Sequence, residues 1–178
     1  YNAGGVIDKR GLLIKNQKWL FNVVEKVFDE VKIKYGLRTK KFHLFGHSAG
    51  GGFVHRYMLL MPNAPVVKAV AANPAFVTLP NQKENYPFGL KNLPVNDRLI
   101  NLWLGKDLAL FLGEEDIGPR TKPLSNGPKA REQGPNCLSR GKKLYRKAKI
   151  EAKKRDTYFG WDLVIVPGVG HDNRLIAP

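Results

Sequence analysis

Short apolar runs alternate along this chain with longer segments in which apolar residues recur at helical spacing. The short runs predict four buried strands, at 41–46, 66–71, 108–112 and 161–166. The longer segments predict helices at 16–35, 49–61, 96–104 and 138–155. Apolar strands that alternate with helices indicate a parallel sheet with helices on both faces. We therefore expect a three-layer α/β fold in a single domain spanning residues 1–178.

The first predicted helix has sequence signals at both ends. Asn16 is a residue type that commonly caps a helix N-terminus, and Gly36 is placed to end the helix after Tyr35. An apolar stripe runs along the helix and consists of Leu20, Val24, Val27 and Val31, widened by Trp19, Val23 and Phe28. This spacing predicts an amphipathic helix with one apolar face.

Two long stretches have no clear periodicity. Residues 74–95 contain several prolines and aromatic residues, which suits a loop or a small cap over a site. Residues 117–137 are rich in Pro, Gly and Lys and predict an irregular excursion. We expect neither stretch to contribute to the sheet.

Composition places the chain among globular proteins. It has 178 residues, 43% of them apolar, which is enough for one domain with its own core. A single cysteine, Cys137, excludes an internal disulfide. No apolar run approaches the length that crosses a bilayer. The chain starts at Tyr1 without an initiator methionine or a signal peptide, so the sequence does not indicate a compartment.

The formal net charge of +15 raises the question of an anionic partner. Much of the charge is local, because residues 140–155 carry nine basic side chains against Glu151 alone. Such a run on an amphipathic helix is most often a solvated face, and no motif that reads RNA or DNA accompanies it. We expect no specific nucleic-acid binding and interpret the basic helix as a solvated surface.

The strand at 41–46 runs into the helix that follows it through Gly46-x-Ser48-x-Gly50. A serine on a sharp strand-to-helix turn has strained backbone geometry, and small neighbours two positions away on either side avoid a clash. The helix directs its N-terminal N–H groups at this serine, and the N–H of Ala49 is placed to donate to a developing oxyanion. This context predicts a nucleophile elbow, against the simpler reading of a glycine-rich turn that contains a serine.

Three predicted strands end in residues that could form a catalytic triad: Ser48, Asp116 and His171. Side chains at the carboxyl ends of parallel strands meet at one edge of the sheet. A serine hydroxyl becomes a useful nucleophile when a neutral imidazole accepts its proton, which gives His171 the role of base. A carboxylate at Asp116 would fix the imidazole tautomer and stabilise the imidazolium.

Other residues compete for these roles. For the acid, Glu114 and Glu115 precede Asp116 directly, but a turn that starts at Gly113 favours the third acidic residue. For the base, the alternatives His43, His47 and His55 fall in a strand, in the elbow itself and in a helix. Asp172 follows His171 and is expected to point away or to cap the next segment.

Three blocks carry a resemblance to a known superfamily: Gly46-His47-Ser48-Ala49-Gly50-Gly51, Gly113-Glu114-Glu115-Asp116 and Val166-Pro167-Gly168-Val169-Gly170-His171. They resemble the nucleophile, acid and histidine blocks of the α/β-hydrolase superfamily. The wider text, including Phe53-Val54-His55-Arg56 and Tyr86-Pro87-Phe88-Gly89-Leu90, is similar to bacterial hydrolases related to polyhydroxybutyrate-depolymerase-type esterases. The resemblance implies the α/β-hydrolase fold and a serine esterase that needs neither a metal nor an organic cofactor.

This sequence departs from the superfamily pattern upstream of the nucleophile. Its second oxyanion donor comes from a loop upstream of the nucleophile, but only 47 residues precede Ser48 and they hold no convincing strand. The stretch from Tyr1 to Gly11 resembles the one that follows the fourth strand of the superfamily. We therefore expect the carboxy-terminal part of the fold, with the edge of strand 41–46 covered by upstream chain or by another polypeptide.

The sequence thus predicts a serine hydrolase that cleaves a small or polymeric carboxylic ester through an acyl-enzyme. Its expected site consists of Ser48, Asp116 and His171, with Ala49 as an oxyanion-hole donor. Two alternatives stay open: an amide or peptide hydrolase with the same triad, and a non-catalytic module of this fold whose basic face binds an anionic partner.

Overall fold

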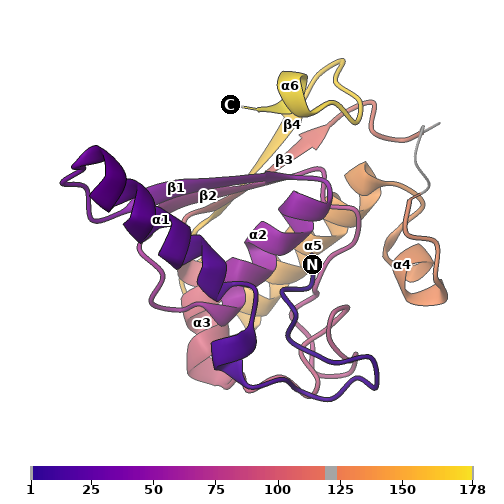
Figure 1. Cartoon of the computed structure of the whole chain (residues 1–178). Helices are drawn as coiled ribbons and strands as arrows, with labels where there is room; N and C mark the ends of the chain where they lie inside the picture. The colour runs from indigo at the N-terminus through magenta and orange to yellow at the C-terminus, as the bar shows by residue number, and fades with distance from the viewer. Residues whose placement is uncertain (1, 119–123, 178) are drawn as a thin grey trace.

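The computed structural model describes residues 2–118 and 124–177 and contains one four-stranded parallel sheet (Figure 1). The strands lie side by side in chain order and are β1 (Phe42–His47), β2 (Val66–Ala72), β3 (Leu108–Gly113) and β4 (Trp161–Val166). Every neighbouring pair is parallel. All four predicted strands are confirmed, and their ends differ from the predicted bounds by one residue at most.

The helices follow the strands as α/β topology requires. After a short 3-10 turn at Asn16–Lys18 they are α1 (Asn22–Tyr35), α2 (Ala49–Leu60), α3 (Asp97–Gly105), α4 (Pro128–Gln133), α5 (Cys137–Lys154) and α6 (Asn173–Ile176). Asn96 caps α3 as its side chain accepts a hydrogen bond from Leu99 N at 3.0 Å. No helix in the described ranges is long and apolar enough to cross a membrane.

Helices lie on both faces of the sheet, but unequally. On one face α2 packs on β1 and β2, α5 packs on β3 and β4, and α3 contacts both helices. On the other face α6 contacts β3 near its carboxyl end and lies across the strands from α2 and α5 (Figure 1). A small second cluster, Ala72, Val169 and Ile176, packs beneath α6, apart from the main core.

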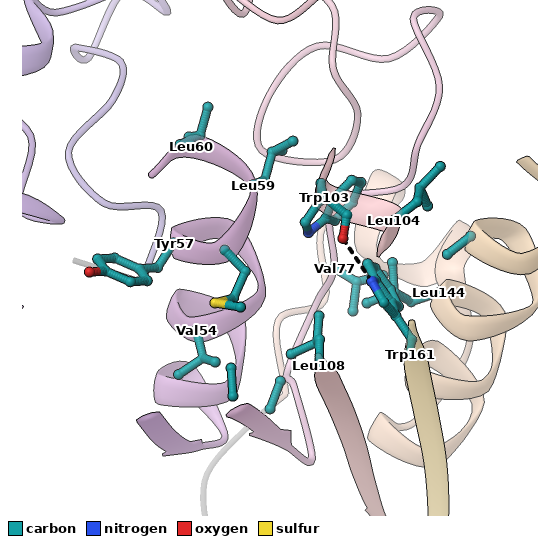
Figure 2. Close-up of a cluster of buried hydrophobic side chains, with 14 of the residues drawn as sticks. Val54, Tyr57, Leu59, Leu60, Val77, Trp103, Leu104, Leu108, Leu144 and Trp161 are labelled. Carbon is teal, nitrogen blue, oxygen red and sulfur yellow. Dashed lines mark hydrogen bonds between the residues drawn. The ribbon is translucent and has the colours of Figure 1, made fainter. Parts of the chain in front are cut away.

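Two tryptophans connect the main core across its elements (Figure 2). The Trp161 ring nitrogen donates to the main-chain oxygen of Trp103 at 3.0 Å, and the two rings meet edge to face at 5.0 Å. Trp103 in turn donates to the main-chain oxygen of His55 at 3.1 Å. Such an aromatic pair contributes about 0.5–1.5 kcal/mol beyond the apolar area that it buries. The contacts tie α3 to β4 on one side and to α2 on the other.

The second face of the sheet is largely open over the described residues. Exposed and less exposed residues alternate along β1 and β4, and Phe45 and Val164 are 38% and 37% exposed. The apolar runs in these strands had predicted a sheet with helices on both faces, and α6 is the smaller of the two covers. Within the described ranges β1 pairs with β2 alone, so its other edge is open. The expected cover of this edge by further polypeptide stays a prediction.

The first helix starts later than its sequence signals predicted. Asn16 opens the 3-10 turn and does not cap a helix, and α1 begins at Asn22. The intervening chain is fixed by burial, because Phe21 is fully buried and its ring lies against Gly4, where a Cβ would come within 2.2 Å of it. The predicted end is confirmed: Gly36 has a φ of 61° and closes α1 after Tyr35.

The apolar stripe of α1 also differs from expectation. Val23 and Val27 are 50% and 51% exposed, and no residue of α1 is fully buried. Instead the helix touches the fold through contacts such as that of Phe28 with Phe42, whose rings lie 4.7 Å apart. The stripe is exposed because the helix rests at the open edge of the sheet, beside β1.

The stretch at 117–137 is not wholly irregular. It contains α4, while its residues 119–123 lie outside the described residues. The following helix, α5, begins at Cys137 because Asn136 and Ser139 form a capping box, with Ser139 N donating to Asn136 Oδ1 at 2.8 Å. Arg140 departs from the predicted solvated face, since it is 1% exposed and donates to main-chain oxygens.

Candidate active site

The turn between β1 and α2 has the backbone geometry of a strained elbow. Ser48 is the one residue between the two elements and has a φ of 57° and a ψ of −113°, a combination that non-glycine residues rarely adopt. Hydrogen bonds hold it there, because Ser48 N donates to Ala72 O at 2.9 Å and Gly52 N donates to Ser48 O at 3.0 Å. The turn therefore presents the Ser48 side chain at the carboxyl end of β1.

The glycines around Ser48 do not share the steric role that the motif predicted. At Gly46 a Cβ would lie 2.4 Å from Gly50 O, so a side chain is excluded there. At Gly50 a Cβ would meet nothing within 4 Å, which contradicts the expected clash at this position. The second tight position is Gly51, where a Cβ would lie 2.4 Å from Ala72 O. The elbow is thus packed closely against the end of β2.

Asp116 and His171, 55 residues apart in the chain, meet at the same edge of the sheet. Asp116 Oδ2 lies 2.7 Å from His171 Nδ1, and the two side chains are 1% and 24% exposed. An imidazole that donates from Nδ1 to a carboxylate leaves Nε2 free to accept a proton. The competing acids lie elsewhere: Glu114 and Glu115 are exposed, and Glu114 accepts from Gly168 N at 3.2 Å.

The elbow and the histidine loop are neighbours in space. The ring of His47, directly before Ser48, lies 4.4 Å from the ring of His171 at an interplanar angle of 40°. Among the described residues no hydrogen bond joins Ser48 Oγ to His171. Bonds of this kind are often long in a site without substrate and tighten when substrate binds. The structure therefore brings Asp116 to His171 and the elbow beside them.

Asn73 is a site residue that the sequence analysis missed. It follows β2, is fully buried and has a φ of 42°, a region that Asn tolerates better than most residues. Its Oδ1 accepts from Gly113 N at 2.8 Å, and its Nδ2 donates to Gly170 O at 3.2 Å. One side chain thus joins the ends of β2 and β3 to the residue before His171. The only signal in the sequence was its place at the end of a predicted strand, before Pro74.

Buried polar side chains hold the segment after Asn73. Each residue from 75 to 78 is bonded through its main chain: Ala75 O to Arg140, Phe76 O to Arg56, Val77 to Gln133, and Thr78 N to His55. Burial lowers the pKa of Arg56 to about 10, so the guanidinium stays charged at neutral pH. The loop predicted over 74–95 therefore begins as a rigid segment next to the site.

His55, a competing histidine, has a structural place. His55 is fully buried, its Nδ1 is 3.0 Å from Gly51 O and its Nε2 accepts from Thr78 N at 3.0 Å. Burial lowers the pKa of His55 well below its ordinary value, so the ring is neutral.

Asp172 caps α6 by accepting from Arg174 N and Leu175 N, as the sequence predicted for it.

One further candidate ligand lies beside Asp116 and His171. Cys137, the first residue of α5, is fully buried, and ligand atoms of Asp116, Cys137 and His171 all lie within 4.8 Å of one another. In the described part of the chain this is the group of three that could hold a metal ion. From the sequence alone, Cys137 indicated only that an internal disulfide is excluded.

Two solved structures resemble this chain over almost its whole length. Poly(aspartic acid) hydrolase-1 from Sphingomonas sp. KT-1 has a TM-score of 0.94 and 35% identity, and the match covers 99% of this chain and 67% of that one. LpqC, a poly(3-hydroxybutyrate) depolymerase from Bordetella parapertussis, has a TM-score of 0.89 and 34% identity over 97% of this chain. The match covers 58% of the LpqC chain, so this chain spans about two thirds or less of each relative.

No model of a protein family matches the sequence, and neither does any curated protein. The parallel sheet, its helices and the two structural relatives nevertheless agree with the resemblance found in the three sequence blocks. The chain belongs to the α/β-hydrolase superfamily.

Proposed function

We propose that this chain carries the catalytic triad of a serine hydrolase that cleaves a carboxylic ester through an acyl-enzyme. Ser48 is the nucleophile, His171 the base and Asp116 the residue that orients it. The observation that carries the proposal is the 2.7 Å contact between Asp116 Oδ2 and His171 Nδ1, at the sheet edge where Ser48 forms a strained turn. Structural packing alone gives no reason for a buried carboxylate to face a partly exposed imidazole there.

The first half of the reaction forms the acyl-enzyme. Ser48 Oγ attacks the carbonyl carbon of the substrate while its proton moves to Nε2 of His171. Asp116 accepts the hydrogen bond from Nδ1–H, keeps the ring in the tautomer with a free Nε2, and stabilises the imidazolium that forms. The imidazolium then returns its proton to the leaving alcohol as the bond from carbon to the alcohol oxygen breaks.

The second half releases the acid. Water gives a proton to Nε2 of His171 and attacks the acyl carbon, and the bond from that carbon to Ser48 Oγ breaks as Oγ takes the proton back. In both halves a negative charge develops on the former carbonyl oxygen. Ala49 is the first residue of α2, so its N–H has no acceptor within the helix and is available to that oxygen.

A second candidate is the hydrolysis of an amide bond by the same residues. It is favoured by the relative that is a poly(aspartic acid) hydrolase, because poly(aspartic acid) is joined by amide bonds. The poly(3-hydroxybutyrate) depolymerase points to esters instead. The triad chemistry serves both bond types, so the choice between them depends on substrate tests and not on the geometry of the triad.

The proposal is tested with a fluorophosphonate probe, which labels an activated serine. We expect the probe to label the parent protein and not Ser48→Ala. The matched control Ser125→Ala, which changes an exposed serine, should be labelled like the parent. Hydrolysis of a 3-hydroxybutyrate oligomer and of an aspartic acid oligomer by the same samples separates ester from amide cleavage. A folded parent protein that the probe does not label would support the non-catalytic alternative.

A further inference from the structure

We propose that Asp116, Cys137 and His171 form a Zn²⁺ site that switches the hydrolase off. The proposal rests on the triad of the proposed function, but its first test does not depend on activity. The three residues offer a carboxylate oxygen, a thiol sulfur and an imidazole nitrogen, which are the three kinds of ligand that Zn²⁺ takes from proteins.

The cluster is already assembled before any ion arrives. Asp116 Oδ2 is 2.7 Å from His171 Nδ1, and ligand atoms of all three residues lie within 4.8 Å of one another. Zn–N and Zn–O bonds of about 2.0–2.2 Å and a Zn–S bond of about 2.3 Å place tetrahedral ligands roughly 3.3–3.8 Å apart. Side-chain shifts of about 1 Å therefore convert the cluster into a coordination site.

One main-chain contact joins the two segments that carry Asp116 and Cys137. Leu138 N, in the first turn of α5, lies 3.5 Å from Asp116 O, which joins the acid loop to the start of the helix that carries Cys137. The positive end of an 18-residue helix favours a negative charge at Cys137, as a zinc-bound thiolate has. His171 is the most exposed of the three, so an ion enters past its ring.

Charges balance in the bound state. Zn²⁺ with one carboxylate, one thiolate and one neutral imidazole has no net charge, which suits a site where Asp116 and Cys137 are 1% and 0% exposed. The thiol proton leaves to solvent. Three protein ligands also leave a fourth position for water, an arrangement typical of zinc sites that are not purely structural.

Zn²⁺ bound to His171 would stop the reaction by removing Nε2 as a proton acceptor. Nδ1 is the His171 nitrogen that faces Asp116, so it is the nitrogen that binds the ion. A neutral imidazole bound through Nδ1 carries its proton on Nε2. Nε2 then donates a hydrogen bond and cannot accept the proton of Ser48, and Asp116 no longer orients the ring. The ion therefore inhibits without touching the nucleophile.

The first experiment measures binding and does not require turnover. Cd²⁺ replaces Zn²⁺ as a spectroscopic probe, because a cadmium–thiolate bond absorbs in the ultraviolet. We expect one Cd²⁺ per chain with this absorption in the parent protein and in Ser48→Ala, and no such absorption in Cys137→Ala. A parent protein without the thiolate absorption overturns the proposal whether or not the hydrolase function holds.

The second experiment measures inhibition of ester hydrolysis by Zn²⁺, with each variant compared to its own rate in a chelator. Loss of even an outer-shell partner weakens metal binding about 10–100-fold, so Cys137→Ala should need at least about 10-fold more Zn²⁺ for half inhibition. The matched control is His43→Ala, which removes an exposed histidine of β1 and should be inhibited like the parent. Equal inhibition of Cys137→Ala and the parent overturns the proposal, because the ion then acts elsewhere.

Discussion

Asn73 donates a hydrogen bond from its side chain to the main-chain oxygen of Gly170, 3.2 Å away, and so ties the end of β2 to the loop of His171. The same side chain accepts from Gly113 N at 2.8 Å, three residues before Asp116. The loops that carry Asp116 and His171 are thus both hydrogen-bonded to the buried side-chain amide of Asn73. We infer that Asn73 is a positioning residue, which acts on the reaction through the placement of His171.

The Asn73 inference is tested by Asn73→Gly, which keeps the positive φ accessible and removes only the side chain. A misplacement of about 1 Å in a catalytic group can lower turnover about 100-fold. We expect kcat to fall about 10–100-fold with KM changed less than about threefold. Asn73→Asp keeps the shape of the side chain and the acceptor for Gly113 N, but it loses the N–H that donates to Gly170 O. Its kcat should therefore fall as far as that of Asn73→Gly. A loss of stability with unchanged kcat would make Asn73 a structural residue only.

The assignment of the acid is tested by comparing Asp116→Asn with Glu115→Gln. Of the two acids, Asp116 is the one whose carboxylate lies 2.7 Å from His171 Nδ1, so we expect kcat of Asp116→Asn to fall about 10⁴-fold through the wrong imidazole tautomer, with the fold intact. The matched control Glu115→Gln changes an exposed side chain and should keep activity within about twofold. Steady-state kinetics on a short-chain ester measure both. If Asp116→Asn kept its kcat while Glu115→Gln lost most of it, the acid would be Glu115 and not Asp116.

The glycines of the elbow should respond in opposite ways to alanine. At Gly51 a Cβ would lie 2.4 Å from a main-chain oxygen, so we expect Gly51→Ala to destabilise the fold by about 1–3 kcal/mol. At Gly50 nothing lies within 4 Å, and a helical alanine is favoured over glycine by about 0.5–1 kcal/mol. Gly50→Ala should therefore be neutral or stabilising. Urea unfolding measures both, and equal losses would contradict the steric account.

The exposed charges of α5 are expected to be a solvated surface. Reversing Lys142, Lys143 and Lys147 to Glu should leave turnover of a neutral short-chain ester unchanged within about twofold. Within the described residues Lys142 and Lys147 are exposed, and Lys143 donates to Glu132 O, away from the triad. Heparin chromatography at increasing salt checks the alternative. If the parent protein is retained strongly and the triple variant loses both retention and activity, the basic face binds an anionic partner.

Lys106 should make stability depend on pH. Burial lowers its pKa to about 8 in the folded protein, from 10.5 in the unfolded chain. Between these values the unfolded chain binds the proton and the folded protein does not, so the free energy of unfolding rises as pH increases through this window. We expect a rise on the order of 1–2 kcal/mol between pH 8 and 9.5. Above about pH 10 the opposite effect sets in, because burial raises the pKa values of Tyr57 and Tyr86.

The control for this pH dependence is Lys106→Met, which removes the titrating group while keeping an apolar stem of similar length. Urea unfolding at pH 8, 9 and 9.5 should then give a flat profile. Lys149→Met, at an exposed position of α5, should keep the slope of the parent. A slope that survives in Lys106→Met would assign the dependence to another group.

Sequence pattern alone determined the elements with strong local signals. Each strand is a run that no helix periodicity explains, and Gly36 ends α1 because its φ of 61° suits a residue without a side chain. The three blocks around Ser48, Asp116 and His171 carried the resemblance to the superfamily, because a sharp turn after a strand leaves a compact signature in the sequence. The start of α1 was predicted wrongly, since burial of Phe21 against Gly4 outweighs the capping preference of Asn16.

Only the tertiary structure decided which residues lie together. Asp116 differs from Glu115 in its burial and in its 2.7 Å contact with His171. Neither property can be read from a run of acidic residues in the sequence. Asn73, and the cluster that adds Cys137, depend on contacts between segments distant along the chain. Local preference determines where an element begins and ends, but a site at a sheet edge is defined by which loops meet there.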